Sequence, residues 1–416
     1  YYGEFRNLCN QYGLVSYCEP YDRGPMEELQ IGSRVDGVMG EFWNGLSAIF
    51  QNNLMMRRTT KLASSIAHIN GQKVVGAEAY TSEPESGRWQ EYPFALKAVG
   101  DKAFTEGINR MVIHRYAMQP HPDAAPAMTL GPWGIHFDRT NTWWETGRAW
   151  IDYLNRCQTL LQEGLFVADF AYFTGDNIVG YTKVHRRDLN PVPPEGYDYD
   201  LMNTETLLNR AWVERGRLRL PDGMNYRVLV LQEQSHITLG LLRKLRNMVE
   251  QGLIIVGARP QQTVGLQSYS VIEEKEFEQL CDELWGKATT TVVDRSVGKG
   301  RIFWETSLNL EQVLEKIQLR PDFEVSTDSI SAPIRYIHRQ IGESDVYFVA
   351  NQQRTSKELI CNFRVKGKIP EFWNPISGER TRAMVYQTNE ETISVPVQLE
   401  AYGSVFVVFR SDLPEQ

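Results

Sequence analysis

The stretch VVGAEAYTS at residues 74–82 decides the fold of this chain. It predicts a short buried β-strand that ends on the carboxylate of Glu78 and continues into a polar loop. In barrel proteins the carboxyl ends of parallel strands form the floor of the functional site, and charged side chains are placed there. The stretch therefore predicts a parallel strand with Glu78 at its functional end.

Three other strands of the chain are expected to end in the same way. One apolar segment leads into Glu19, the next leads into Glu41, and a third, beyond residue 82, leads into His114. The carboxyl ends of neighbouring parallel strands meet at one edge of a sheet. Together the four strand ends predict a single polar site.

Helical and strand patterns alternate over residues 1–175, which predicts a parallel sheet with crossover helices. About four strands are present, half of the eight in a closed barrel. A proline-rich connector follows at residues 176–197, a second α/β pattern at 198–320, and β patterning at 325–416. The sequence thus predicts an α/β protein: the C-terminal half of a (β/α)8 TIM-like barrel, a small α/β domain, and an antiparallel β-sandwich.

The periodicity of apolar residues also predicts the individual elements of the first segment. All of them are assigned to the expected barrel. Helices are predicted at residues 1–12, 45–70, 93–107 and 146–164, and strands at residues 14–17, 35–40, 74–78, 110–114 and 166–173.

Composition is that of an ordinary globular protein and argues against two functional classes. The 416 residues are 42% hydrophobic and carry a net charge of −8. An acidic chain lacks the basic surface of a general nucleic-acid-binding protein, and no apolar run reaches the roughly 20 residues that span a membrane. The five cysteines are widely spaced without a zinc pattern, so free thiols are expected. The sequence opens at Tyr1 rather than Met, so it carries no information about a signal peptide.

Glutamates at one edge of a sheet are the residues that acid/base cleavage of a glycosidic bond requires. One carboxyl group protonates the leaving oxygen, while a carboxylate on the other face activates water or attacks directly. Glu78 is the leading candidate, and its structural alternative is an ion pair with Arg110 or Arg115. For Glu19 and Glu41, a role in the pocket and structural pairing both remain open.

Other side chains near these strand ends suggest ligand binding. Asp22 and Asp36 lie close to the glutamates in sequence, and clustered carboxylates suit a hard cation such as Ca²⁺. No EF-hand loop is present, so such a site would have to be assembled from separate loops. His114 could hydrogen-bond a sugar hydroxyl, orient a carboxylate, or be a satisfied core residue.

A long loop at residues 119–144 follows the last of these strands. Long loops at this face of a barrel usually carry substrate contacts, which makes Asp138 and Arg139 candidate binding residues. Trp143 and Trp144 either stack on a sugar ring or cap the helix that follows the loop.

Together these residues resemble glycoside hydrolase family 106, the α-L-rhamnosidases, over most of the chain. Each string is weak alone, and their order and spacing carry the resemblance. The matching strings are EPYD at 19–22, MGEFW at 39–43, GAEAYT at 76–81, GINR at 107–110 with His114, GIHFDRTNTWW at 134–144, YLNRCQ at 153–158, YDYD at 197–200 and WNP at 373–375.

The resemblance implies an inverting, exo-acting, calcium-dependent rhamnosidase with accessory β domains, secreted or periplasmic in bacteria that degrade plant polysaccharides. Its partner would be a rhamnose-containing oligosaccharide or polysaccharide, with no nucleic acid and no membrane span. By similarity Glu78 is the general base that activates water, Glu41 supports it or binds substrate, and His114 contacts the sugar. The substrate-binding set is Glu19, Asp22, His114, Asp138, Arg139, Trp143 and Trp144, and the metal candidate is Asp36.

The sequence departs from the family pattern in one respect. The family's catalytic acid comes from an earlier barrel strand, so we expect the acid upstream of Tyr1. The half-barrel count agrees with this expectation.

Two alternatives remain open. One is a retaining glycosidase of another barrel family, such as a β-galactosidase, whose two carboxyl groups would lie roughly 5 Å apart rather than about 6.5–9.5 Å. The other is a non-catalytic carbohydrate-binding remnant that kept the pocket and lost the acid.

Overall fold

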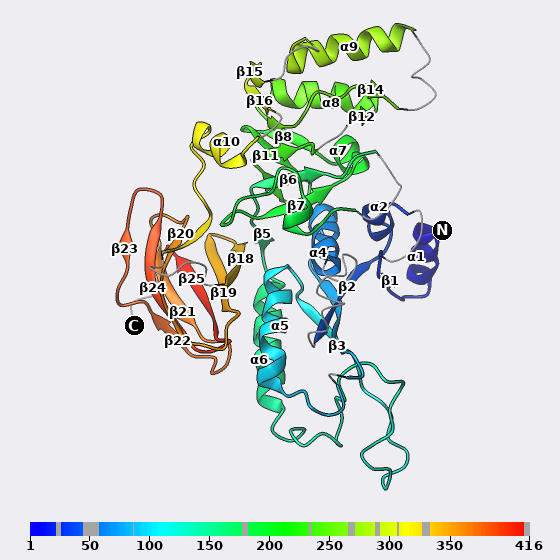
Figure 1. The fold of residues 1–416 in the computed structure, drawn as a ribbon, viewed down its shortest axis with the longest axis vertical. Helices are drawn as coiled ribbons and strands as arrows, with labels where there is room; N and C mark the ends of the chain where they lie inside the picture. The colour runs from blue at the N-terminus through cyan, green and yellow to red at the C-terminus, as the bar shows by residue number, and fades with distance from the viewer. Residues whose placement is uncertain are drawn as a thin grey trace.

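The chain is organised around three groups of sheets, which Figure 1 shows from the N-terminal elements through the upper α/β unit to the C-terminal antiparallel sheets. The computed structural model describes residues 1–21, 26–44, 58–85, 87–176, 182–232, 235–264, 271–287, 292–305, 308–326 and 333–411.

The first sheet is parallel and runs in the order β1-β2-β3-β4. Its strands are β1 (Tyr17–Cys18), β2 (Gly37–Asn44), β3 (Val75–Ser82) and β4 (Arg110–Ile113). Seven of the eight residues of β3 are buried, as expected for a parallel strand covered on both faces. The parallel α/β pattern predicted for this part of the chain is therefore present.

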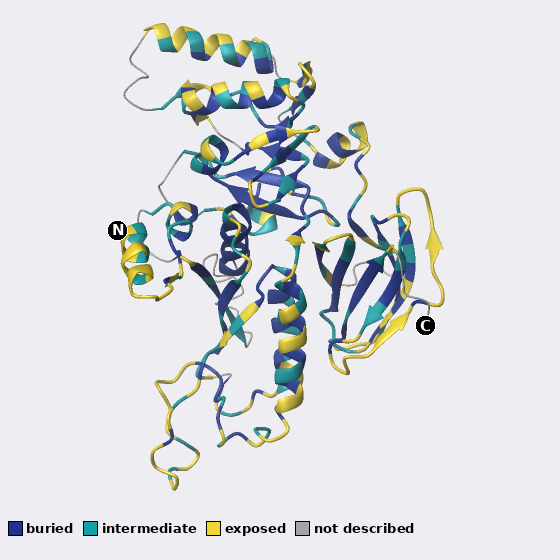
Figure 2. Cartoon of the chain, turned by 180° about the vertical axis from the view of Figure 1, so that it is seen from behind, coloured by how far each residue is buried: buried dark blue, intermediate teal, exposed yellow. Residues whose placement is uncertain are grey.

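Helices connect and cover this sheet. Helix α4 (Thr59–Asn70) is buried along almost its whole length, because it lies between β2 and the second sheet (Figure 2). Helices α5 (Pro93–Thr105) and α6 (Arg148–Leu161) follow β3 and β4, as predicted. The helix predicted at residues 45–70 is described only from Thr59, since residues 45–57 lie outside the described part of the chain.

The second sheet is six-stranded, in the order β15-β16-β13-β11-β6-β7. It includes β6 (Phe170–Phe173), which pairs in parallel with β11 and β7. The strand predicted at residues 166–173 was therefore assigned to the wrong sheet. Its first part, β5 (Leu165–Phe166), pairs instead with an antiparallel strand near the C-terminus. An apolar run predicts a buried strand, but it does not predict which other strands will pair with it.

Two antiparallel sheets follow, in the orders β17-β20-β24-β23 and β22-β21-β25-β19-β18-β5. Residues of both sheets share one hydrophobic core, which includes Phe363 and Val395 from the first and Val349 and Phe409 from the second. The strands are β17 (Phe323–Ser326), β18 (Ile334–Ile341), β19 (Ser344–Asn351), β20 (Lys357–Phe363), β21 (Ile369–Trp373), β22 (Arg380–Arg382), β23 (Gln387–Thr388), β24 (Ile393–Leu399) and β25 (Ser404–Arg410).

None of the helices in the described ranges could cross a membrane, and the five cysteines are free thiols. The remaining elements are α1 (Tyr2–Gln11), α2 (Glu28–Gly32), η1 (Arg186–Asp188), β7 (Tyr199–Met202), α7 (Thr204–Asn209), β8 (Trp212–Glu214), β9 (Arg217–Arg219), β10 (Asn225–Tyr226), β11 (Val228–Val230), β12 (His236–Ile237), α8 (Leu239–Glu250), β13 (Ile254–Val256), β14 (Gln262–Thr263), α9 (Val271–Trp285), β15 (Val293–Val297), β16 (Gly300–Trp304) and α10 (Leu310–Lys316).

Candidate active site

Two of the predicted carboxylates lie side by side in the first sheet. Glu41 on β2 is paired in register with Glu78 on β3. Neighbouring strands are about 4.8 Å apart, and residues in register on parallel strands point to the same face. Glu41 and Glu78 therefore share one face in the middle of their strands.

Glu41 is held in a fixed orientation. Its carboxylate is 9% exposed and accepts hydrogen bonds from the Tyr21 hydroxyl on Oε2 and the Trp43 indole on Oε1, both at 3.1 Å. Its backbone N–H donates to Thr59 Oγ1 at 3.0 Å. Tyr21 and Trp43 thus position the carboxylate, and the start of α4 holds the backbone of the same residue.

Glu78 is more open to solvent. Its side chain is 29% exposed, its Oε1 accepts a hydrogen bond from the Thr81 hydroxyl, and His114 Nδ1 lies 3.8 Å from the same oxygen. The strand does not end at Glu78 as predicted but continues to Ser82, because the polar residues that follow are buried and take part in the sheet. The carboxylate remains available to a reacting molecule.

His114 follows β4 directly and is positioned by its backbone, whose N–H donates to Ala79 O at 2.8 Å. Burial lowers the pKa of the imidazole, and Arg115 lowers it further, while Glu78 acts in the opposite direction. The ring is therefore neutral at pH 7. Its Nδ1 is buried without a hydrogen-bond partner in the described part of the chain.

Glu19 belongs to the same site. Partial burial and the negative charges of Glu78 and Glu41 raise the pKa of its carboxyl to about 7, although a hydrogen bond involving Tyr21 acts in the opposite direction. Three of the predicted carboxylates thus influence one another. The fourth, Asp22, lies outside the described residues.

Asp36 lies elsewhere. It precedes β2 and so lies at the amino end of this strand, before the position of Glu41. Its carboxylate accepts hydrogen bonds from Ser16 N–H at 2.8 Å and Ser16 Oγ at 2.9 Å. Over the described ranges, no group of three or more His, Cys, Asp or Glu side chains is placed to hold a metal ion. The calcium site therefore stays a prediction with no ligand assigned among these residues.

The two predicted polar residues of the long loop support its shape. Asp138 is buried and accepts hydrogen bonds from Thr140 N–H at 2.8 Å and from the Gln119 amide at 3.1 Å. Arg139 is exposed, and its guanidinium donates to Gln119 O at 3.0 Å. These contacts are within the loop and do not reach the glutamates.

The two tryptophans make packing contacts. Trp143 lies 5.8 Å from Trp150 of α6 at an angle of 88°, and its indole N–H donates to Glu91 O at 2.8 Å. Trp144 lies 5.1 Å from Phe137. The two expectations were stacking on a sugar ring and capping of the helix that follows. These contacts correspond to packing around the start of that helix.

One residue near the site had no signal in the sequence. Glu91 is 6% exposed, and its Oε1 accepts a hydrogen bond from the hydroxyl of Ser82, the last residue of β3. Burial raises the pKa of its carboxyl. Its Oε2 is buried without a partner in the described structure. A glutamate inside a loop, with no strand before it, cannot be placed here from sequence.

Comparison with known proteins shows the family of this chain, although one relative carries the name of another activity. A model of glycoside hydrolase family 106, described as alpha-L-rhamnosidase, matches residues 1–388. A protein of Formosa agariphila named "Putative beta-glucuronidase" is 37% identical over 417 positions, which cover 100% of this chain. The solved structure of a rhamnosidase from Novosphingobium sp. PP1Y superimposes with a TM-score of 0.87 at 31% identity over 100% of this chain.

The chain spans only part of these relatives. It covers 33% of the Formosa protein and 39% of the Novosphingobium rhamnosidase. A more distant likeness concerns the fold alone: a β-galactosidase from Bacillus circulans sp. alkalophilus matches 92% of this chain and 61% of its own at a TM-score of 0.53 and 11% identity.

Proposed function

Because this chain belongs to the α-L-rhamnosidases of glycoside hydrolase family 106, we propose that it forms part of an enzyme that releases terminal α-L-rhamnose from plant or microbial glycans. The carrying observation is the pair of carboxylates, Glu41 and Glu78, in register on adjacent parallel strands. Carboxylates facing a sugar from such a position are what hydrolysis of a glycosidic bond uses.

In the proposed inverting mechanism Glu78 is the general base. Its Oε1 takes a proton from a water molecule as the water oxygen attacks the anomeric carbon. The Thr81 hydroxyl orients this carboxylate, and His114 lies beside it. Glu41, held by Tyr21 and Trp43, binds sugar hydroxyls.

The leaving oxygen must be protonated at the same time. We propose that the acid lies upstream of Tyr1, as the family pattern implies. Within this chain, Glu19 is the second candidate, since a carboxyl with a pKa of about 7 is partly protonated at neutral pH. The variant Glu19→Gln distinguishes these two candidate acids. If Glu19 is the acid, the variant loses turnover, and substrates with good leaving groups restore it because they need no protonation.

Other parts of the proposal rest on the family. We propose that the parallel sheet is part of a (β/α)8 barrel, that the two antiparallel sheets form a β-sandwich, and that the enzyme is secreted or periplasmic. We propose domains at residues 1–175, 176–197, 198–320 and 325–416, except that β6 pairs with strands of the second α/β unit. A calcium ion is retained with no ligand assigned and no part in the steps above.

A β-glucuronidase is the second candidate function, favoured by the name of the Formosa relative. Charge argues against it at this site. A glucuronate carboxylate at this site would approach Glu19, Glu41 and Glu78, and like charges at short range repel. Arg115, which follows His114, donates to the backbone oxygens of Trp133 and Gly131.

The deciding experiment compares an aryl α-L-rhamnoside with an aryl β-D-glucuronide, and determines the anomeric configuration of the first product by proton NMR. We expect turnover of the rhamnoside with inversion, and reduced turnover after chelation if calcium is required. Turnover of the glucuronide alone would overturn the substrate, and retention of configuration would overturn the mechanism.

A further inference from the structure

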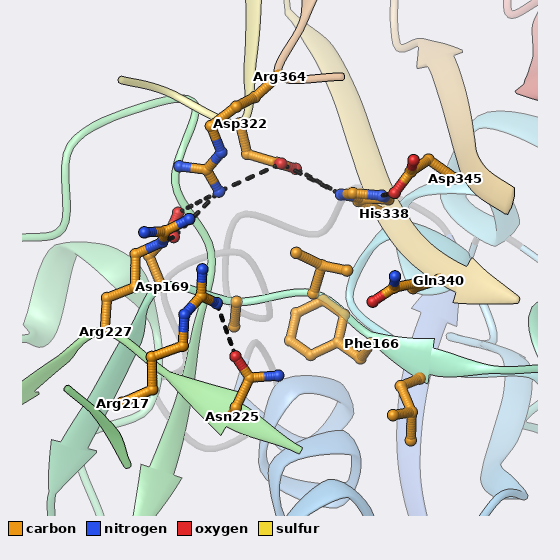
Figure 3. Close-up of a pocket in the computed structure, with 13 residues that line it drawn as sticks. Phe166, Asp169, Arg217, Asn225, Arg227, Asp322, His338, Gln340, Asp345 and Arg364 are labelled. Atoms are coloured by element: carbon orange, nitrogen blue, oxygen red, sulfur yellow. Dashed lines mark hydrogen bonds and ion pairs between the residues drawn. The ribbon is translucent and has the colours of Figure 1, made fainter. Parts of the chain in front are cut away.

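A polar cavity of about 150 Å³ lies between the second α/β unit and the antiparallel sheets (Figure 3). Two of its residues, Asp169 and Arg227, directly precede β6 and β11. The cavity is therefore at the amino ends of the second sheet and is separate from the glutamates of the first. None of its lining residues takes part in the proposed hydrolysis.

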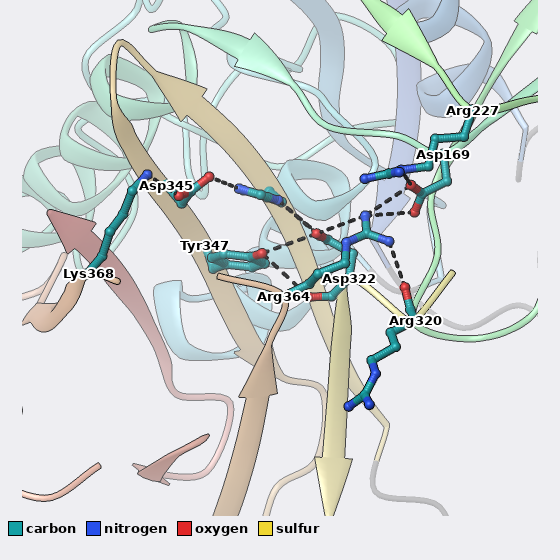
Figure 4. Close-up of polar contacts among 9 residues, drawn as sticks. Asp169, Arg227, Arg320, Asp322, Asp345, Tyr347, Arg364 and Lys368 are labelled. Carbon is teal, nitrogen blue, oxygen red and sulfur yellow. Dashed lines mark hydrogen bonds and ion pairs between the residues drawn. The ribbon is translucent and has the colours of Figure 1, made fainter. Parts of the chain in front are cut away.

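Three guanidinium groups converge on one wall of this cavity (Figure 3). Arg364 and Arg227 both pair with the buried carboxylate of Asp169, at 2.9 and 3.1 Å. Arg364 also reaches Asp322 at 3.3 Å (Figure 4). The carboxylates on this wall are thus already occupied by two arginines.

The third arginine, Arg217, has no such partner. Its guanidinium donates to the neutral Asn225 Oδ1 at 2.7 Å, and no carboxylate of the described residues lies within ion-pair distance of it. Burial lowers its pKa to about 10, and the positive charges of Arg227 and Arg364 act in the same direction, whereas the negative charge of Asp169 opposes them. A half-buried cation repelled by its neighbours is a binding element for an anion.

The net charge of the residues that line the cavity also favours binding of an anion. His338 lies between Asp322 and Asp345, and although burial opposes its charge, these carboxylates raise its pKa to about 9, so it is positive at pH 7. The lining then carries four positive groups, Arg217, Arg227, Arg364 and His338, against three negative ones, Asp169, Asp322 and Asp345. The balance is one positive charge.

We propose that this cavity binds one small oxyanion, with Arg217 as its principal ligand and the Gln340 amide on the opposite wall. The volume corresponds to that of about five water molecules at roughly 30 Å³ each, which accommodates a sulfate, a phosphate or the carboxylate end of an acidic sugar. The shared chemistry is a compact group of negatively charged oxygens, which arginine forks recognise.

The test is isothermal titration calorimetry of the protein with sodium sulfate, sodium phosphate and sodium glucuronate, against chloride at constant ionic strength and pH 7. The variant Arg217→Gln removes the unpaired charge. Arg243→Gln is the matched control, because Arg243 forms an exposed ion pair with Glu276 on α9. We expect Arg217→Gln to weaken binding by at least about tenfold, since a charge-assisted hydrogen bond is worth roughly 1.5–3 kcal/mol, and the control to leave it unchanged.

The possible results distinguish two kinds of anion, and they include results that would overturn the proposal. Binding of inorganic sulfate or phosphate identifies a free anion, whereas binding of glucuronate alone identifies an acidic sugar branch. No binding, or equal binding by Arg217→Gln, overturns the proposal. Loss of a repelled charge should leave the melting temperature in chloride unchanged or raised. If Arg217→Gln does not fold, Arg217→Lys, which keeps the charge and loses the fork, is expected to weaken binding instead. The readout is binding, so it is independent of glycosidase activity.

Discussion

At the scale of single residues, the candidate active site is a set of glutamates whose charges oppose one another. Glu78 is the proposed base. The Thr81 hydroxyl and the His114 imidazole lie beside its carboxylate. The hydroxyl orients the carboxylate, and neither neighbour neutralises it. The chemistry can therefore be tested by removing one charge at a time.

Replacing Glu78 with Gln keeps the shape of the side chain and removes its basicity. We expect kcat to fall by about 10²- to 10⁴-fold, the usual contribution of a positioned base, with the melting temperature nearly unchanged. Kinetics on an aryl α-L-rhamnoside provide the measurement. The matched control is Glu85→Gln, on the exposed loop after β3, which should retain full activity. Undiminished turnover by Glu78→Gln would exclude it as the base.

Glu19 makes stability depend on pH. Its folded pKa of about 7 lies above the ordinary value of 4.5, so the folded state holds a proton that the unfolded state releases between these values. By linkage, stability is fully present below about pH 4.5 and is lost as the pH rises to 7. We expect Glu19→Gln to melt at a higher temperature than the wild type at pH 8 and at a similar one at pH 4. Thermal melts at both pH values test this, and an equal difference at both would contradict it.

At the scale of elements, the site depends on how closely α4 approaches β2. A Cβ on Gly40 would lie 2.6 Å from the backbone oxygen of Thr59, whereas a Cβ on Gly76 would lie 2.6 Å from Cγ of the flexible Met39 side chain. Backbone cannot move aside, but a methionine can change rotamer. The two glycines therefore differ in what an added methyl group costs.

This difference gives a matched pair of variants. Gly40→Ala should destabilise the fold by about 1–3 kcal/mol and lower activity, because it displaces the Thr59 contact that positions Glu41. Gly76→Ala should cost less, since Met39 can repack. Urea unfolding of both proteins is the measurement, and the prediction would be wrong if Gly76→Ala were the more damaging of the two.

His338 ties β18 and β19 to the segment before β17. It is 4% exposed and contacts Asp322 and Asp345, each at 3.0 Å. Its folded pKa of about 9 exceeds the ordinary 6.5, which corresponds to roughly 3 kcal/mol at about 1.4 kcal/mol per unit. This stabilisation is complete below pH 6.5 and is lost as the pH rises through 9. We expect the free energy of unfolding of the wild type to fall over this pH window, and that of His338→Gln to change much less. Urea titrations at several pH values measure both.

At the scale of the whole molecule, Arg364 joins the second α/β unit to the antiparallel sheets. It follows β20, is largely buried, and pairs with Asp169 before β6 and with Asp322 before β17 (Figure 4). Truncating one member of a buried ion pair leaves the others uncompensated, at a typical cost of 3–5 kcal/mol.

We therefore expect Arg364→Ala to lower stability by about that amount and to separate thermal unfolding into two transitions, measured by calorimetry. Arg320→Ala is the control, because the ion pair of Arg320 with Glu391 is well exposed and exposed pairs contribute at most about 1 kcal/mol. Equal effects of both variants would show that the two units are not joined through this network.

Much of the first sheet could be predicted because its signals are local. Apolar strands followed by polar residues predicted the parallel pairing and brought Glu19, Glu41 and Glu78 to one site, and the family resemblance was confirmed. Their catalytic roles remain predictions. Glu91 could not be found, because its burial comes from contact with the end of β3 rather than from any pattern around it.

The sequence by itself determined the parallel α/β pattern of the first sheet, the family to which the chain belongs, and the grouping of Glu19, Glu41 and Glu78. Only the tertiary structure decided that β6 joins the second sheet, that Asp36 lies at the amino end of its strand, and that Arg217 stands without a carboxylate partner. The physical reason is the distance along the sequence over which each kind of interaction acts. Periodicity and turn chemistry act between near neighbours in sequence, whereas sheet membership, burial and charge balance depend on groups that meet only when distant segments pack together.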